Sequence, residues 1–239
     1  MLEVRGLTRR FGGLVAVNDL SFKVNEGDMI GLIGPNGSGK TTTFSMLSGA
    51  LKPSAGTITF NGERIEALKA NQVCRKGLAR TFQVVQPFPD ITAVENVMIG
   101  AFVNTSSGRQ AEAKAREMLE HVGLTPKADT LGKELTLVQL KSLEVAKALA
   151  TEPKLLLLDE VAAGLNSTEV DVMLGLVRRL HSEGITCIIV EHVLRFVMNL
   201  SHRCIVIDFG SQIAEGTPEE VLNNPAVHAA YLGEEASIA

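Results

Sequence analysis

Nine residues near the start of the chain constrain its fold more than any others. Residues 34–42 read Gly-Pro-Asn-Gly-Ser-Gly-Lys-Thr-Thr, which satisfies the phosphate-loop pattern G-x-x-x-x-G-K-[ST]. The apolar run 29–33 before the loop predicts a buried strand, and residues 41–50 after it predict the first turns of a helix. Because strand, loop and helix are in register, we interpret the pattern as a phosphate site and not as a chance glycine-rich turn.

The residue types of the loop suit an anionic ligand. Glycines let the backbone approach phosphate closely, since a Cβ atom would block the approach. The N–H groups and the dipole at the start of the helix favour negative charge. Lys40 is expected to reach the β- and γ-phosphates of a nucleotide, and the Thr41 hydroxyl to hold Mg²⁺. The predicted nucleotide-binding residues of the loop are Gly34, Pro35, Asn36, Gly37, Ser38, Gly39, Lys40, Thr41 and Thr42.

A second motif predicts hydrolytic chemistry. Four leucines at 155–158 precede Asp159 and Glu160, and such a continuous apolar run indicates a strand buried on both faces. Carboxylates at its C-terminal end are expected at the crevice where open α/β sheets bind ligands. Asp159 is predicted to bind Mg²⁺ through a water, and Glu160 to polarise the water that attacks the γ-phosphate. Two acids after a strand are a weak indication alone, but they become a strong one behind a phosphate loop.

His192 is a further candidate, because it follows a predicted strand at residues 186–190. It is placed to donate a hydrogen bond to the γ-phosphate or to the attacking water. A structural role is the competing interpretation, which we adopt for the other four histidines: His121, His181, His202 and His228.

Periodicity predicts an α/β chain with a helical insertion. At 239 residues the chain is long enough for one large domain, or for a domain with an inserted lobe. Strands alternating with helices indicate a mostly parallel sheet. Residues 94–150 have a helical pattern, whereas strands are predicted at 2–11, 21–25, 57–60, 78–82, 155–158, 186–190 and 204–207.

Composition excludes several classes of protein. The net charge of −4 gives no electrostatic basis for binding nucleic acid. No run of 18 apolar residues predicts a membrane span, and the N-terminus lacks the apolar core of a signal peptide. Three cysteines without metal-ligand spacing suit a reduced cytosolic compartment, with Cys187 and Cys204 as small buried hydrophobic residues.

Together these segments resemble the ATP-binding subunits of ABC transporters along nearly the whole chain. The resemblance implies a P-loop NTPase (RecA-like) core, an N-terminal antiparallel β subdomain and an inserted helical subdomain. It implies one nucleotide-binding domain over 1–239, in which 1–83 and 151–239 form the core and 84–150 the helical lobe. The matching segments are 34–42 (Walker A), Gln83 (glutamine loop), 155–160 (Walker B and catalytic Glu), 163–166 (D-loop) and His192 (switch histidine).

Further roles follow from the resemblance alone. Gln83 is expected to contact Mg²⁺ or the attacking water, and to link the two lobes. Phe11 falls at the aromatic position that stacks on adenine in this family. ATP and Mg²⁺ are the implied cofactors. The catalytic residues are then Glu160, His192 and Gln83, and the metal ligands Thr41, Gln83 and Asp159.

Segments 10–18, 79–83, 162–166, 216–220 and 231–234 resemble the subfamily that serves branched-chain amino acid importers. These bacterial importers combine two ATPase subunits, usually different, with two permease subunits and a periplasmic binding protein. The resemblance therefore implies a peripheral protein on the cytoplasmic face of the inner membrane. Related systems carry urea or aromatic acids, so the cargo does not follow from the ATPase.

One motif departs from the family. The signature L-S-G-G-Q is replaced by Leu135-Thr136-Leu137-Val138-Gln139, and Val161 stands where the family has proline. Thr136 and Gln139 keep polar groups that are expected to contact a partner subunit's nucleotide. Because that loop works through closely approaching N–H groups, Leu137 and Val138 are expected to hinder it. A heterodimer with an intact partner suits this departure better than a homodimer, unless the N–H groups alone matter.

Two surfaces and three other functions remain open. The stretch 84–96 is either an interface for a permease helix or a core-facing loop, and Arg75, Lys76 and Arg80 are interpreted as a solvated basic face. The alternatives for function are an ABC ATPase without a permease, a small-molecule kinase, and a regulatory subunit that binds ATP but scarcely hydrolyses it. Gln83, residues 163–166 and His192 argue against the kinase, and the altered signature keeps the regulatory subunit open.

Overall fold

The computed structural model describes residues 1–235, and the side chains of residues 1–231, as two compact units. The first unit contains Met1–Val73 and the chain from Thr186 onward, and the second is Cys74–Ile185. The chain leaves the first unit within helix α2 (Ala70–Arg75). The lobe boundaries expected from the sequence, at residues 84 and 150, stay a prediction.

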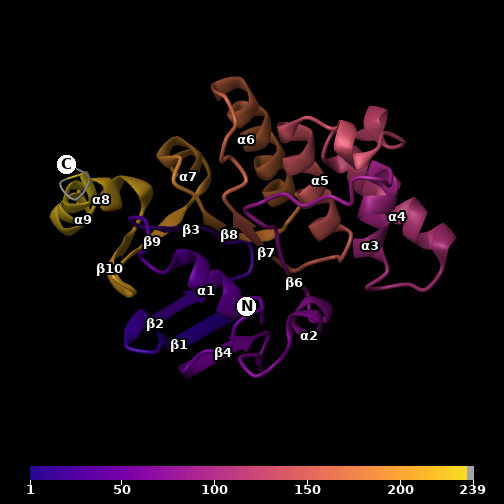
Figure 1. The fold of residues 1–239 in the computed structure, drawn as a ribbon. Coiled ribbons are helices and arrows are strands. Elements are labelled where there is room, and N and C mark those ends of the chain that lie inside the picture. Colours follow the sequence, from indigo (N-terminus) through magenta and orange to yellow (C-terminus); the bar gives the residue numbers. More distant parts are fainter. Residues whose placement is uncertain (236–239) are drawn as a thin grey trace. The chain divides into compact units, whose positions relative to one another are not determined.

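An antiparallel sheet forms one layer of the first unit (Figure 1). Its order is β2-β1-β4-β5, with a two-residue turn at Gly12 and Gly13 between the first two strands. Gly56 has φ +89°, and a Cβ atom there would lie 2.4 Å from the Gly6 carbonyl oxygen, so only glycine lets β4 pass β1 so closely. The strands are β1 (Leu2–Phe11), β2 (Leu14–Val24), β4 (Ala55–Phe60) and β5 (Glu63–Arg64).

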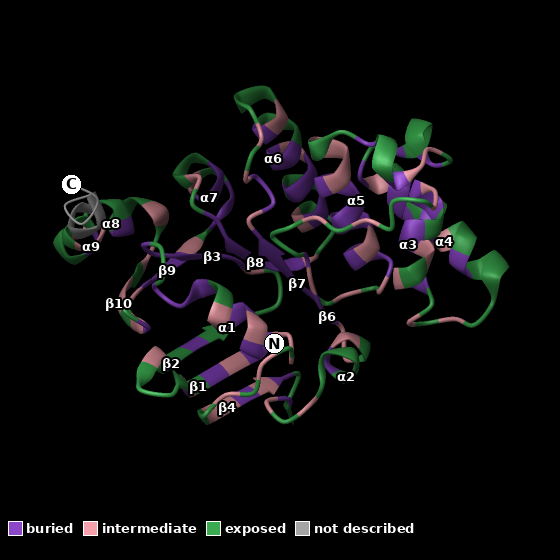
Figure 2. Ribbon diagram, in the orientation of Figure 1, coloured by how far each residue is buried: buried purple, intermediate pink, exposed green. Residues whose placement is uncertain are grey.

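Four further strands of the first unit lie in the order β10-β9-β3-β8. Strand β3 runs parallel to β8 and β9, and every residue of β3 and β8 is buried (Figure 2). Strand β10, which the sequence did not predict, pairs antiparallel with β9. The elements are β3 (Met29–Ile33), α1 (Lys40–Leu47), β8 (Thr186–Val190), α7 (Leu194–Leu200), β9 (Arg203–Asp208), β10 (Ser211–Gly216), α8 (Pro218–Leu222) and α9 (Pro225–Glu235).

The second unit combines two parallel strands with a group of helices. Strand β6 pairs with β7, with Arg80 opposite Leu157. Helix α3 packs against α4 and α5, and the buried alanines Ala111 and Ala115 line the inner face of α4. The elements are β6 (Leu78–Arg80), α3 (Ala93–Ala101), α4 (Gly108–His121), the 3₁₀ turns Thr125–Lys127 and Gly132–Glu134, α5 (Leu137–Leu149), β7 (Leu155–Asp159) and α6 (Ser167–Ser182).

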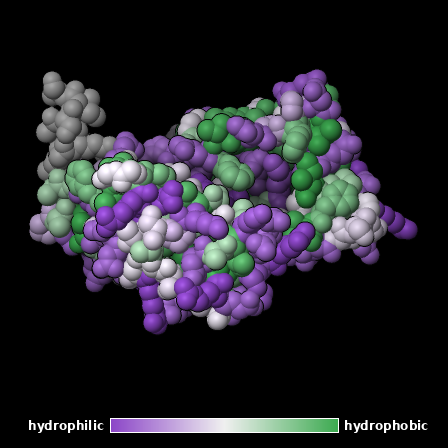
Figure 3. Space-filling view, turned by 60° about the horizontal axis from the view of Figure 1, so that its bottom comes forward, coloured by the Kyte–Doolittle hydropathy of each residue, from purple (hydrophilic) through white to green (hydrophobic). Residues whose placement is uncertain are grey.

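Hydrophobic side chains reach the surface in separate patches among hydrophilic ones (Figure 3). Within residues 1–235, no helix combines the length and the apolar character needed to cross a membrane. Cys187 and Cys204 are buried, as the sequence predicted. Burial raises the pKa of the Cys187 thiol to about 12 and that of Cys204 to about 11, so both behave as small apolar side chains.

Two helical glycines predict opposite effects of one substitution. At Gly100 in α3, a Cβ atom would lie 2.2 Å from the Lys147 carbonyl oxygen of α5, whereas at Gly175 in α6 it would meet nothing within 4 Å. We expect Gly100→Ala to lower the free energy of unfolding by about 1–3 kcal/mol, as overpacking does. Gly175→Ala should raise it by up to about 1 kcal/mol, since alanine favours helix over glycine.

Urea unfolding followed by circular dichroism measures both changes. Equal effects of the two substitutions would contradict the close approach of α3 and α5 at Gly100.

Candidate functional site

The phosphate loop lies in the first unit, between β3 and α1. A Cβ atom at Gly34 would lie 1.9 Å from the Ile207 carbonyl oxygen, and one at Gly39 would lie 2.5 Å from the Ala16 carbonyl oxygen. The loop is therefore packed too tightly against backbone for any side chain at these two positions. Gly39, in the left-handed region, is the N-cap of α1 and leaves the N-terminus of that helix without a side-chain cap. Such a helix start suits an anion.

Lys40 lies folded back over the loop that precedes it. Its side chain is buried, and Nζ donates hydrogen bonds to the carbonyl oxygens of Gly34 at 2.7 Å and Pro35 at 2.6 Å. The ammonium group is thus held at the loop by two backbone acceptors. Thr41 is exposed and Thr42 half-buried. The phosphate and metal roles of these residues stay predictions.

Gly210 joins three segments around the loop. Its N–H donates to the Ser38 carbonyl oxygen at 2.9 Å, and its own carbonyl oxygen accepts from the Asn18 N–H at 2.8 Å. It has φ +80°, and a Cβ atom there would lie 2.8 Å from the Ala16 carbonyl oxygen. Glycine therefore ties the phosphate loop to the turn between β9 and β10 and to β2.

Phe11 ends β1 and is 46% exposed. The Arg9 guanidinium carbon lies 4.5 Å from the centroid of the phenyl ring, within cation–π range. Arg9 is itself held by a 2.8 Å hydrogen bond to the Lys52 carbonyl oxygen. One face of the ring is therefore covered by a fixed cation, while a large part of the ring stays accessible for stacking.

His192 is the other predicted site residue of this unit outside the phosphate loop. It is exposed and lies just after β8.

In the second unit, Asp159 ends β7 with no exposed surface. Its Oδ2 atom accepts from Arg80, at 2.7 Å from one terminal nitrogen and 3.2 Å from Nε. Burial raises the pKa of the Asp159 carboxyl, and the hydrogen bond and charge of Arg80 oppose that rise. The interpretation of Arg80 as part of a solvated basic face is wrong: its side chain is only 9% exposed and pairs with a buried carboxylate.

Glu160 follows in the left-handed region, with φ +49°. For a non-glycine residue this conformation stores strain, which is common at functional sites. Its Oε2 accepts a 2.6 Å hydrogen bond from Gln83 Nε2. Buried Lys141 of α5 donates to the carbonyl oxygens of Gln83 at 2.9 Å and Glu160 at 2.8 Å. The structure thus brings Gln83 and Glu160 together, as their predicted roles require, and fixes both backbones with one cation.

Sequence reasoning missed Arg80 and Lys141, although each left a signal. Arg80 lies within the strand predicted at 78–82, and parallel neighbours bring their carboxyl ends together. Lys141 interrupts the apolar face of a predicted helix, where a buried ammonium group must find acceptors. In both cases the partner was an acid or a backbone carbonyl in another segment.

The altered signature begins helix α5. Thr136 is the N-cap, and its N–H donates to Gln139 Oε1 at 3.0 Å. Leu137 is 43% exposed, and its Cδ2 atom would lie 3.3 Å from a Cβ atom placed on Gly164. The Gln139 oxygen is therefore engaged within the helix start, and the Leu137 side chain lies over the 163–166 segment.

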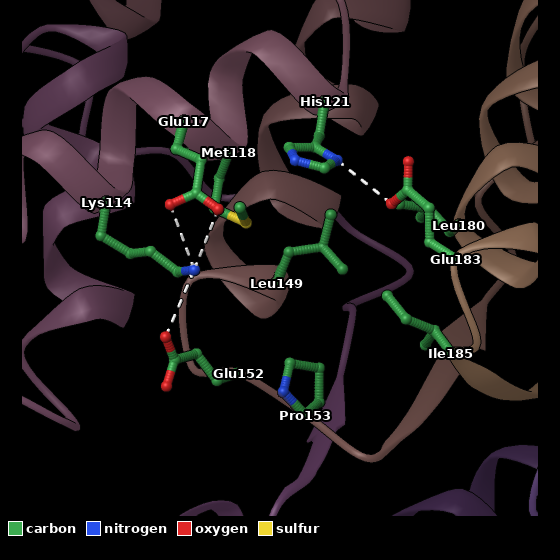
Figure 4. Close-up of a pocket in the computed structure, with 10 residues that line it drawn as sticks. All are labelled: Lys114, Glu117, Met118, His121, Leu149, Glu152, Pro153, Leu180, Glu183 and Ile185. Carbon is green, nitrogen blue, oxygen red and sulfur yellow. Dashed lines mark hydrogen bonds and ion pairs between the residues drawn. The ribbon is translucent and has the colours of Figure 1, made fainter.

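A separate pocket of about 260 Å³ lies where α4, the end of α5 and the end of α6 meet (Figure 4). Lys114 pairs with Glu117 and Glu152, each at 3.2 Å, and His121 lies 3.1 Å from Glu183. These charged groups already satisfy one another. The residues that line the pocket include none of the predicted site residues.

Comparisons with known proteins agree with the predicted family. The ABC transporter family model matches residues 17–163, and the model described as branched-chain amino acid ATP-binding cassette transporter matches residues 211–237. BraF of Pseudomonas aeruginosa, a high-affinity branched-chain amino acid transport ATP-binding protein, is 42% identical over 98% of both chains. LivG of Escherichia coli, described in the same words, is 39% identical over 98% of both.

A solved structure supports the fold. The ADP conformation of an ATP-binding cassette of an ABC transporter has a TM-score of 0.89 and 32% identity, and the match covers 98% of each chain. This likeness confirms the predicted fold class, an α/β fold with a P-loop NTPase core. The roles of the individual site residues stay predictions.

Phe11 provides a direct test of base stacking. Stacking on an aromatic ring is worth about 1–3 kcal/mol per base, so Phe11→Ala should weaken ATP affinity about fivefold to 150-fold. Leu14→Ala, an exposed change in the same hairpin, should leave the affinity unchanged. Fluorescence titration with labelled ATP measures both.

Inorganic tripolyphosphate has no base, so its inhibition constant, measured by competition with labelled ATP, should be the same in the wild type and both variants. A parallel loss of tripolyphosphate binding in Phe11→Ala would show damage to the phosphate loop instead of a lost stack.

Proposed function

Since the chain belongs to the ABC transporter family, as an ATP-binding subunit closely related to the ATPases of branched-chain amino acid importers, we propose that it hydrolyses ATP to drive the import of branched-chain amino acids or a related small solute. The observation that carries hydrolysis is the 2.6 Å hydrogen bond between Gln83 and Glu160 next to the buried Asp159. A catalytic carboxylate oriented by an amide is what water activation needs.

Binding of ATP is assigned to the first unit. The loop from Gly34 to Thr42 takes the phosphates, with Lys40 as the cation that neutralises the β- and γ-phosphates. Phe11 takes the adenine. His192 donates a hydrogen bond to the γ-phosphate or to the attacking water, which its exposed position after β8 allows.

The residues fit a magnesium ion. Asp159 Oδ1 is buried and, among the described residues, has no hydrogen-bond partner. An orphaned buried acceptor of this kind suits a metal-bound water, and Thr41 offers an exposed hydroxyl. We propose Asp159 and Gln83 as metal-binding residues of the second unit and Thr41 as a metal-binding residue of the first; the metal, when bound, would neutralise phosphate charge. Glu160 accepts the proton of the attacking water.

Exposed hydrophobic side chains at residues 82–102 support a permease partner. Within residues 82–102 of the second unit, five large hydrophobic side chains are each more than 40% exposed: Phe82, Val84, Phe88, Ile99 and Phe102. Asn96, fully buried, accepts from the Phe88 N–H at 2.8 Å and donates to the Phe88 and Ile91 carbonyl oxygens. Of the two interpretations left open for residues 84–96, this anchored and exposed loop favours the interface.

In this function the subunit lies at the cytoplasmic face of the inner membrane, where it binds permease subunits and a second ATPase, and a periplasmic binding protein delivers the solute from outside. Because Leu137 and Val138 replace the signature glycines, the second ATPase is a different chain with an intact signature. The second candidate function, a regulatory ATP-binding subunit, is favoured by this departure alone.

ATP hydrolysis separates the two candidates. We expect the chain to hydrolyse ATP in the assembled transporter, with Glu160→Gln slowing hydrolysis about 10²- to 10⁴-fold, since the base is lost. Affinity for ATP should stay within about threefold of the wild type, because the phosphate loop is untouched. Steady-state phosphate release, alone and with the partner ATPase and permeases, measures this.

Tight ATP binding without hydrolysis in any assembly would contradict the favoured function and support the regulatory one.

Restoring the signature tests the effect of the departure. The double change Leu137→Gly and Val138→Gly should raise ATPase activity of the assembled complex, because the N–H groups of α5 can then approach the partner's γ-phosphate. Val172→Gly, an exposed apolar residue in α6, controls for the cost of glycine in a helix. No gain over this control would count against the idea that these side chains hinder hydrolysis.

A further inference from the structure

Two donors of Arg80 converge on one oxygen of Asp159. The terminal nitrogen lies 2.7 Å and Nε 3.2 Å from Oδ2, while Oδ1 is buried and without a hydrogen-bond partner in the described part of the chain. The carboxylate is therefore divided into an oxygen held by the protein and an oxygen left for something else. We infer that Arg80 is a positioning residue for the metal, which commits Asp159 to present Oδ1 alone; this inference rests on the function proposed above.

The backbone around the pair fixes its orientation. Thr81, the residue after Arg80, accepts the Asp159 N–H with Oγ1 at 3.0 Å, and its own N–H donates to the Leu157 carbonyl oxygen at 2.9 Å. Arg80 and Leu157 are register partners in the parallel pair β6–β7. The end of β6 therefore holds both the backbone and the side chain of Asp159.

The guanidinium group is confined as well. It lies 5.8 Å from the centroid of the Phe82 ring, and its side chain is 9% exposed. A planar donor with two nitrogens on one oxygen has less freedom than an ammonium group on a flexible stem. The side chain thus restrains rotation of the carboxylate about χ2, which would otherwise exchange the two oxygens.

A purely structural role is a poorer account of this arrangement. Buried ion pairs are commonly no more stabilising than apolar residues of the same volume, and an orphaned carboxylate oxygen adds a further cost. A hydrogen bond from a metal-bound water to Oδ1 would remove the cost of leaving this oxygen without a partner. Partners of metal ligands commonly change metal affinity when mutated, about 10- to 100-fold.

The test compares Arg80→Gln with Arg75→Gln, the same substitution at an exposed arginine in the last turn of α2. Affinity for fluorescent ATP is measured in EDTA and in Mg²⁺, and the Mg²⁺ concentration for half-maximal hydrolysis is measured in the assembled complex. Arg80→Gln should bind ATP in EDTA as the wild type does. It should lose most of the gain in affinity from Mg²⁺, and need about tenfold more Mg²⁺ for half-maximal hydrolysis.

Maximal hydrolysis at saturating Mg²⁺ should recover in Arg80→Gln to within a few-fold of the wild type. Arg80→Lys, which keeps the charge but not the planar fork, should show a smaller shift in the same direction, and it also serves if Arg80→Gln does not fold. Unchanged Mg²⁺ dependence in the folded Arg80 variants would overturn the inference while leaving the proposed function intact. If neither ATP affinity nor hydrolysis depends on Mg²⁺ in the wild type and in Arg75→Gln, the proposed metal site is wrong, and the inference falls with it.

Discussion

The ion pair between Arg80 and the buried carboxylate of Asp159, at the end of β7, is the interaction on which the candidate site of the second unit depends. Removing one partner of a buried ion pair commonly costs about 3–5 kcal/mol, so Asp159 and Arg80 must be kept together. The pairing of β6 with β7 and the hydrogen bond from the Asp159 N–H to Thr81 Oγ1 keep the two residues in place. The residues that follow the two strands, Gln83 and Glu160, then meet because their strands end side by side.

Lys141 extends this arrangement into the helices. Its buried ammonium group holds the carbonyl oxygens of Gln83 and Glu160, while its backbone belongs to α5, the helix that starts at the altered signature. Charge-assisted bonds of this kind are about twice as strong as neutral ones. Lys141 therefore links the helix that starts at the altered signature to the backbone of both predicted catalytic residues, Gln83 and Glu160, within one unit of the chain.

The sequence predicted the elements that local pattern determines. The phosphate loop and the leucine strand appear close to their expected bounds, and residues 94–150 contain helices α3, α4 and α5, because glycine spacing, apolar runs and 3.6-residue periodicity are local properties. Strand β10 was missed because half-exposed Ser211–Gly216 carries too few apolar residues to show a period. Arg80 was misjudged because its burial depends on Asp159, 79 positions away, and its place in a predicted strand does not by itself identify that partner. The roles of the individual site residues, which rest on resemblance and chemistry, remain predictions.

Gly210 has a thermodynamic consequence for the phosphate loop. Two hydrogen bonds join this residue to the phosphate loop and to β2, and neighbouring backbone leaves no room for a side chain at Gly34, Gly39 or Gly210. The loop is thus ordered by the protein's own backbone before any ligand arrives. Ordering a residue costs about 1–2 kcal/mol of conformational entropy, and here folding meets that cost in advance. More of the interaction energy with phosphate is then expressed as affinity, which preorganisation provides without a single additional contact.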